Sequence, residues 1–290
     1  MKTLNRFIVE RLKINKDTKP IQYNYHPKDF NELRSLLEQL LKERGKDADL
    51  NDIDVSKVTT FYDNNNKIGL FENLDPHNID ISRWDVSNVE NMSYMFQHCN
   101  HFNCDLSRWD VSTVFDMVSM FFGCKNFNCD LSKWNVSNVE YMESMFVNCK
   151  TFRGQGLENW NISNVIKDMG SMFSGCENFN CDLSKWDVSN VKYMGSMFCH
   201  CENFTGQGLE KWDVSNVENM NAMFYNCKNF DCDLSKWDVS NVKDIKFTFC
   251  GCEKFTGQGL DKWKPINVWN MYAMFDDCTS LKNKPSWYKE

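Results

Sequence analysis

The chain has 290 residues, 42% of them hydrophobic, and a formal net charge of −7 at pH 7. This apolar content excludes disorder as the default state. The negative charge disfavours a nucleic-acid partner, since binding to phosphates depends on clustered Lys and Arg. No run of about 18 apolar residues occurs, so we expect no membrane span.

The first 20 residues form an amphipathic, basic segment. Charged residues interrupt it, so it lacks the continuous apolar core of a secretory signal. We therefore expect a cytoplasmic or virion location, with the cysteines as thiols in a reducing compartment. A flexible or docking helix is one interpretation. The other is that "MKTLNRFIVE" is similar to capsid-targeting leaders of phage head proteins, which are cut after a hydrophobic-x-Glu triplet such as Ile8-Val9-Glu10.

The next segment, "PKDFNELRSLLEQLLKERGKD", has the pattern of an ordinary amphipathic helix that ends at Gly45. We predict that it caps a repeat domain, and an independent partner-binding helix is the alternative. Residues 1–48 then form the N-terminal segment and capping helix. The apolar stripe of the predicted helix consists of Phe30, Leu33, Leu36, Leu37, Leu40 and Leu41.

The rest of the chain, residues 49–290, is repetitive. A degenerate first repeat spans 49–80, where Ile53 replaces the tryptophan of the later copies. Eight repeats follow from about 81 to 280, and 281–290 form a C-terminal cap in which Trp287 begins an unfinished strand. A fixed period of 25 or 26 residues is typical of a solenoid. The eight repeats are anchored by Trp84, Trp109, Trp134, Trp160, Trp186, Trp212, Trp237 and Trp263.

Each repeat predicts one strand and one helix. The stretch "RWDVS" alternates apolar and polar side chains, which indicates a short strand with one buried face. Apolar residues then recur at helical spacing from Val89 to Cys99, and Ser87 with Glu90 would form a capping box. We therefore predict an α/β fold: a right-handed, leucine-rich-repeat-like solenoid with one short strand and one short helix per repeat and an N-terminal helical cap.

The repeat "MFQHCNHFNCDLSRWDVSNV" resembles the BspA-like class of leucine-rich-repeat proteins, in the subfamily with WDVSNVxxMxxMF repeats. The resemblance covers about residues 50–290. It implies a bacterial or phage protein that acts in adhesion or protein binding, with surface exposure in many members and no catalytic residues. The missing export signal departs from those members.

The chemistry-bearing residues form no recognisable active site. All 14 cysteines occupy repeat positions, where cysteine serves as a small apolar filler. The C-H-C stretch at 199–201 is a poor match to zinc-ligand spacing. The five histidines make no motif with a nucleophile, and no P-loop, Rossmann or HExxH pattern occurs. We expect no catalytic residues, no cofactor and no metal, so the chain is not predicted to be an enzyme.

The remaining hypothesis is a non-enzymatic scaffold for protein–protein interaction or adhesion, monomeric or weakly self-associating. A phage-encoded or virion-associated structural protein is the first alternative, and an enzyme with a site distributed over the repeats is a distant one. Outward aromatic side chains suit an interface, although they could instead pack against the next coil. The candidate partner-binding residues are Tyr94, Phe115, Phe122, Tyr141, Tyr193, Tyr225, Trp269 and Tyr272, with Phe247 at a similar position.

Overall fold

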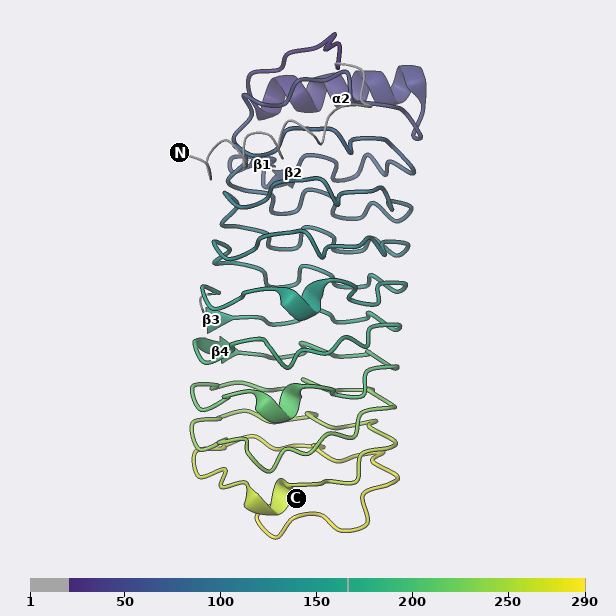
Figure 1. The fold of residues 1–290 in the computed structure, drawn as a ribbon. Coiled ribbons are helices and arrows are strands. Elements are labelled where there is room, and N and C mark those ends of the chain that lie inside the picture. Colours follow the sequence, from purple (N-terminus) through teal and green to yellow (C-terminus); the bar gives the residue numbers. More distant parts are fainter. Residues whose placement is uncertain (1–20, 166, 290) are drawn as a thin grey trace, which may run out of the picture.

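The structure, a computed structural model, describes residues 21–165 and 167–289. The chain winds into successive coils that stack along one axis, with the long helix α2 lying across one end of the stack (Figure 1). The triplet Ile8-Val9-Glu10 lies outside the described residues, so the leader hypothesis has no structural counterpart here.

Helix α2 spans Phe30–Arg44, as its sequence predicts. The Asp29 side chain accepts a hydrogen bond from the Glu32 amide at its start, and the Gly45 amide donates to the Leu41 carbonyl at its end. Five of the six stripe residues are buried, and Leu36 is partly buried against the same core. The helix therefore covers the apolar interior of the first coil.

The other regular elements are very short. Strands β1 (Tyr62–Asp63) and β2 (Ile68–Gly69) form an antiparallel hairpin within the degenerate repeat. Strands β3 (Lys167–Asp168) and β4 (Val191–Tyr193) pair in parallel between neighbouring coils. Single 3₁₀ turns η1 (Leu157–Asn159), η2 (Leu209–Lys211) and η3 (Leu260–Lys262) follow the long glycine-containing turns.

Neighbouring coils are joined by parallel backbone hydrogen bonds. The amides of Met92, Tyr94, Phe96 and His98 donate to carbonyls of the next coil at 2.7–2.9 Å. Isolated parallel bridges continue this pairing along the stack, for example from Asn91 to the equivalent residue of the next coil. Each coil therefore satisfies much of its backbone through its neighbours, which is how a repeat protein holds together.

Segment 89–99 and its equivalents in the other repeats differ from the predicted helix. Among the described residues of the eight repeats no α-helix occurs, because two residues of each coil have left-handed backbone angles that interrupt helical bonding. The first set, which we call the Tyr94 column, is Tyr94, Ser119, Ser144, Ser171, Ser196, Ala222, Phe247 and Ala273. The second, the His98 column, is His98, Gly123, Asn148, Gly175, His200, Asn226, Gly251 and Asp277.

The predicted capping box and strand are also replaced by other structure. Ser87 donates its amide and its hydroxyl to the Asp85 carboxylate, at 3.2 and 2.6 Å, which makes an Asx-turn rather than a helix cap. The Glu90 amide donates to the Thr59 carbonyl of the preceding coil. In this coil the backbone bridge between coils falls at Asn91, after the stretch predicted to be the strand.

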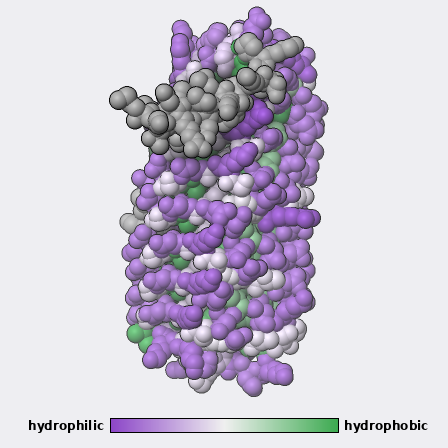
Figure 2. Space-filling model, viewed as in Figure 1, coloured by the Kyte–Doolittle hydropathy of each residue, from purple (hydrophilic) through white to green (hydrophobic). Residues whose placement is uncertain are grey.

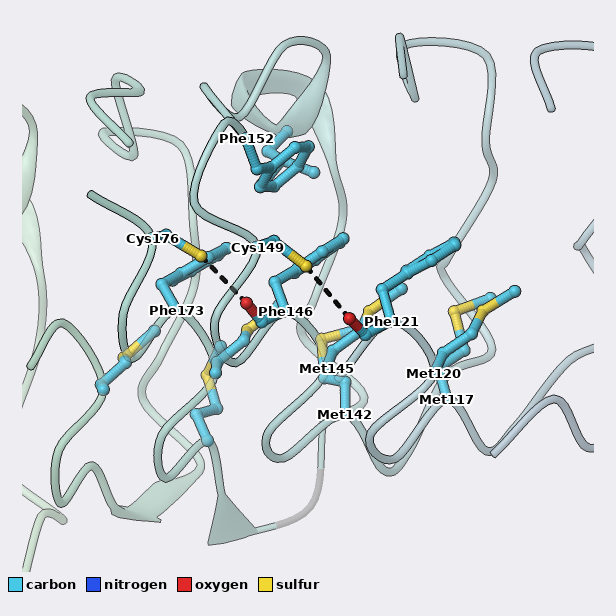
Figure 3. Packing of buried hydrophobic residues seen from close by; sticks show 14 of the residues in the cluster. Met117, Met120, Phe121, Met142, Met145, Phe146, Cys149, Phe152, Phe173 and Cys176 are labelled. Atoms are coloured by element: carbon cyan, nitrogen blue, oxygen red, sulfur yellow. Dashed lines mark hydrogen bonds between the residues drawn. The ribbon is translucent and has the colours of Figure 1, made fainter. Parts of the chain in front are cut away.

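The interior is built from continuous rows of aromatic rings. One row, the Phe96 ladder, stacks neighbouring rings at centroid distances of 5.3–5.9 Å (Figure 3). It consists of Phe71, Phe96, Phe121, Phe146, Phe173, Phe198, Phe224, Phe249 and Phe275. The eight repeat tryptophans form another row, only 2–4% exposed. Each donates its indole N–H to a leucine or isoleucine carbonyl of a preceding coil, as Trp84 does to Leu50.

In each of the eight repeats a cysteine lies three residues after the phenylalanine of the Phe96 ladder, and it does more than fill space in the core. Each of these eight thiols donates to a carbonyl of the preceding coil at 2.9–3.3 Å, as Cys149 does to Phe121 and Cys176 to Phe146 (Figure 3). Burial raises their pKa, so they stay protonated donors at neutral pH. The column therefore packs the core and also links consecutive coils.

The two ends of the stack reuse the same contacts. In the degenerate coil, Ile53 is buried and Ser56 donates to Asp54 as the later serines do to their aspartates. At the other end, Trp287 stacks on Trp263 at 6.0 Å and donates its indole N–H to Leu260. Trp287 thus takes the place of a tryptophan in the next position of the row.

Candidate functional site

The aromatic residues predicted to bind a partner differ widely in exposure. Phe115, Tyr141 and Tyr193 are 38–42% exposed, whereas Trp269 and Tyr272 reach 73% and 71%. The remaining three, Tyr94, Phe122 and Tyr225, are half-buried. The face seen in Figure 2 is largely hydrophilic, with apolar residues confined to narrow stretches between polar ones.

The half-buried rings near the helical cap pack against neighbours. Tyr94 stacks on Tyr62 of β1 at a centroid distance of 5.4 Å. Phe122 meets the edge of the His98 ring at 5.4 Å. These contacts fit the packing alternative for Tyr94 and Phe122, since each ring is partly covered by an adjacent coil.

A second row of rings lies nearer the C-terminal end. Tyr225 contacts His200 and Phe247 edge to face, at 5.3 and 6.2 Å, and Phe247 contacts Tyr272 at 5.4 Å. Tyr272 is the exposed end of this row. The structure therefore brings Tyr225 and Tyr272 together through Phe247, while Phe115 and Tyr141 lie on earlier coils.

Three charged residues on consecutive coils form two ion pairs that share one carboxylate. Glu218 accepts from Lys192 at 3.0 Å and from Lys243 at 2.7 Å, one oxygen to each. Hydrogen bonds from Lys243 and Lys192 lower the pKa of the Glu218 carboxyl to about 2. The three side chains are solvent-accessible, so the pairing orders the surface more than it stabilises the fold.

Two open pockets meet at Trp269. One, of about 510 Å³, is lined by the ion-paired residues and by the asparagines Asn216, Asn241 and Asn267. Each of these asparagine side chains donates to a serine carbonyl of the preceding coil at 2.7–2.8 Å, which fixes its position in the pocket lining. The other pocket, also about 510 Å³, is lined by Trp269 and Tyr272 together with residues of the last coil.

We call this region the Trp269 surface and define it by Lys192, Tyr193, Glu218, Lys243, Trp269 and Tyr272. Its aromatic members were among the residues predicted from sequence. Its charged members were not, although Lys192 and Lys243 each lie one coil, 26 and 25 residues, from Glu218 and the repeat period places them side by side. Ile266 is 77% exposed, and it was not predicted from sequence as an exposed apolar residue.

The described thiols are poor nucleophiles. Burial raises the pKa of the thiols, to about 12 for Cys129 and Cys181, which opposes formation of a nucleophilic thiolate. In the C-H-C stretch, the Cys201 thiol donates into the core to Phe173, while the exposed His200 ring contacts Tyr225. The described chain does bring Asp75, His77 and His101 together, with one possible ligand atom of each within 4.8 Å of the other two. Sequence reasoning missed this cluster.

These features define a repeat protein made of stacked 25- and 26-residue coils. The chain belongs to the family described as Mycoplasma protein of unknown function, DUF285, which matches residues 35–155, 65–180, 130–208 and 197–289. The four matches overlap and run through the repeats, as expected when one repeated unit defines a family. No curated protein and no solved structure matches the chain significantly.

In the part of the chain that the structure describes, no helix is both long enough and apolar enough to cross a bilayer.

Proposed function

We propose that this chain is a non-enzymatic repeat scaffold that binds a protein partner through the Trp269 surface. The observation that carries the proposal is the position of Trp269 and Tyr272, whose rings are more than 70% exposed on the rims of two adjoining pockets. Exposed aromatic side chains are unfavourable in water and dominate the binding energy of many interfaces.

The surroundings of Trp269 have the organisation of an interface. Large rings supply the apolar contact area, and the asparagines and the Lys192–Glu218–Lys243 pairs supply a polar rim. The three asparagine side chains are hydrogen-bonded to the preceding coils, so a partner meets a preorganised surface and binding costs little entropy to order it.

We also propose the finer classification that the sequence suggests: a right-handed solenoid of the leucine-rich-repeat type, related to the BspA-like proteins and acting in adhesion or protein binding. The WDVSNVxxMxxMF motif and the stacking of coils in Figure 1 support this proposal. An experimental structure of the full chain tests the hand of the winding, and left-handed coils would contradict it.

The binding proposal is tested with surface variants of the full chain. Tagged wild-type protein is used to isolate a partner, whose affinity is then measured with the purified pair. The variant Trp269→Ala/Tyr272→Ala should weaken binding at least about tenfold, since truncated aromatic anchors commonly cause losses of this size. The matched control is Phe115→Ala/Tyr141→Ala, which removes two exposed rings from other coils.

Three outcomes decide whether a partner binds at the Trp269 surface. Loss of affinity in the first variant with near-wild-type affinity in the control supports the Trp269 surface. Equal affinities for both variants and the wild type would overturn it, as would the absence of any saturable partner. Thermal unfolding of each variant separates loss of binding from loss of folding.

A further inference from the structure

A cluster of two histidines and one aspartate lies near the helical cap, far along the stack from the Trp269 surface. One ligand atom from each of Asp75, His77 and His101 lies within 4.8 Å of the other two. The His101 Nδ1 atom is 3.2 Å from the nearer Asp75 carboxylate oxygen, and the His77 and His101 ring centroids are 4.6 Å apart.

The fold positions these side chains through the backbone. The His77 amide donates to the Lys46 carbonyl, in the loop that follows α2, at 2.8 Å. Asp75 and His101 are 26 residues apart, one coil, and the His101 amide also approaches the Asp75 carboxylate at 3.5 Å. The cluster thus joins two consecutive coils at the point where the loop after α2 reaches them.

We propose that Asp75, His77 and His101 bind a divalent first-row transition-metal ion, with Zn²⁺ as the reference ion. Two imidazoles and one carboxylate are a ligand set that zinc uses, and three protein ligands leave a coordination position for water. His101 is exposed and the other two are half-buried, so solvent reaches the site and the side chains have room to close around an ion.

Lys46 is the competing cation. Its ammonium nitrogen lies 3.8 Å from an Asp75 oxygen, and its side chain is 46% exposed. A metal ion that takes both the carboxylate and the imidazoles displaces this ammonium to solvent. Removal of the Lys46 charge therefore tightens metal binding, which distinguishes a metal site from a cluster held together by the lysine.

Eight of the cysteines are unsuited to compete for the ion in the folded protein. The thiols that follow Phe96 and its equivalents in the eight repeats are buried and donate to backbone carbonyls, so metal binding there would require the core to open. Sulfur ligation and imidazole–carboxylate ligation are also distinguishable by spectroscopy, because Co²⁺ bound to thiolate shows an intense charge-transfer absorption that nitrogen and oxygen ligands lack.

The test uses the full chain titrated with ZnCl₂ by calorimetry and with CoCl₂ by absorption spectroscopy. We expect one site of micromolar or tighter affinity in the wild type. His77→Ala and His101→Ala should each weaken binding at least about 100-fold, whereas Lys46→Ala should strengthen it. His26→Ala is the matched control, because His26 also contacts an aspartate, Asp54 at 3.2 Å, but has no second histidine.

A wild-type affinity no tighter than that of His77→Ala, or a thiolate charge-transfer band with Co²⁺, overturns the proposal. Circular dichroism shows whether each variant is folded. If an alanine variant unfolds, His77→Gln and His101→Gln take its place, since they retain side-chain volume and polarity. A metal-dependent rise in melting temperature that is present in the wild type and lost in both histidine variants supports a structural link between the first coils.

Discussion

Helix α2 and segment 89–99 carry nearly the same apolar spacing, yet only α2 is a helix. In α2 a side-chain cap and a glycine stop accompany that spacing. In segment 89–99, Tyr94 and His98 have φ of 56° and 62°, and alternate amides donate to the next coil instead of to the preceding turn. Equal hydrophobic patterns thus lead to different backbones.

The difference lies in where the hydrogen-bond partners come from. A lone amphipathic segment must satisfy its backbone internally, and a helix does so. A segment that recurs every 25 or 26 residues has an identical segment beside it, which supplies carbonyls at a fixed spacing. Tight turns, in which an amide donates to the carbonyl three residues earlier, then direct the same apolar residues inward. The Met95 amide, for example, donates to the Met92 carbonyl.

The largest expected effect follows from the cysteines, which the coils contain and α2 lacks. Burial raises the pKa of the Cys124, Cys201 and Cys227 thiols above the ordinary value of 9.0, so the folded state favours the protonated form. This contribution is fully present below pH 9 and is lost progressively as the pH rises above 9. Each buried thiol lowers the free energy of unfolding by about 1.4 kcal/mol per pH unit in that range.

We therefore expect cooperative alkaline unfolding that begins soon above pH 9. Thiolate absorbance near 240 nm and far-UV circular dichroism should change together as the pH is raised. Thiolate formation near pH 9 without loss of the circular dichroism signal would show that the thiols are accessible in the folded coils.

The next effect is removal of one ring from the Phe96 ladder. Phe173 is fully buried between Phe146 and Phe198, at centroid distances of 5.7 Å on both sides. Phe173→Ala should lower the free energy of unfolding by about 3–5 kcal/mol, measured by urea denaturation. Exposed Phe115 is the control, and Phe115→Ala should change stability by less than about 1 kcal/mol. Similar losses in the two variants would mean that the ladder is not a packed core.

Much of the interior could be predicted because the repeat itself reveals it. The tryptophan, methionine, phenylalanine and cysteine positions predicted to face inward are buried in most coils. Trp287 could be placed for the same reason. The local backbone could not be predicted from spacing, since periodicities of three and four describe both a helix and a chain of tight turns. The recurrence of Gly and Asn in the His98 column indicated left-handed backbone at that position, because these residues adopt positive φ most readily.

The candidate site also has residues that the sequence could predict and residues that it could not. Trp269 and Tyr272 could be singled out as large apolar residues at variable positions. The Lys192–Glu218–Lys243 pairs and the Asp75–His77–His101 cluster depend on which residues of neighbouring coils touch. Aligning the repeats by their period would have placed these residues side by side, whereas a linear motif search passes over them.

A smaller effect compares two glycines that share a positive φ but differ in ψ, which is −17° at Gly208 and 176° at Gly45. Gly208 has φ of 94°, and a Cβ there would lie 2.3 Å from the Ser184 amide nitrogen of the preceding coil. Gly45, at the end of α2, has φ of 86° and no atom within 4 Å of such a Cβ. Gly45→Ala should cost about 1–3 kcal/mol from backbone strain alone, since its combination of φ and ψ is nearly confined to glycine. Gly208→Ala should cost roughly 2–4 kcal/mol, because the overlap with Ser184 adds to the strain of a left-handed L-residue. Chemical denaturation gives both values, and a loss of about 1 kcal/mol or less for Gly208→Ala would mean that the coils are not in close contact there.

The smallest effect is a serine-to-glycine substitution, which should change stability in opposite directions in α2 and in the repeats. Ser35 is exposed in the middle of α2, and Ser35→Gly should lower the free energy of unfolding by about 0.5 kcal/mol, since glycine is a poorer helix former. Ser196 belongs to the Tyr94 column, with φ of 57°.

At Ser196 the same substitution relieves the cost of a left-handed L-residue, about 1 kcal/mol or more, which exceeds the added flexibility of the unfolded chain. Ser196→Gly should therefore stabilise the protein by about 0.5 kcal/mol. Urea denaturation of both variants, with the wild type measured in parallel, resolves opposite shifts of this size. If Ser196→Gly destabilises the protein as Ser35→Gly does, the coils contain helical backbone at this position and the distinction between α2 and the repeats is wrong.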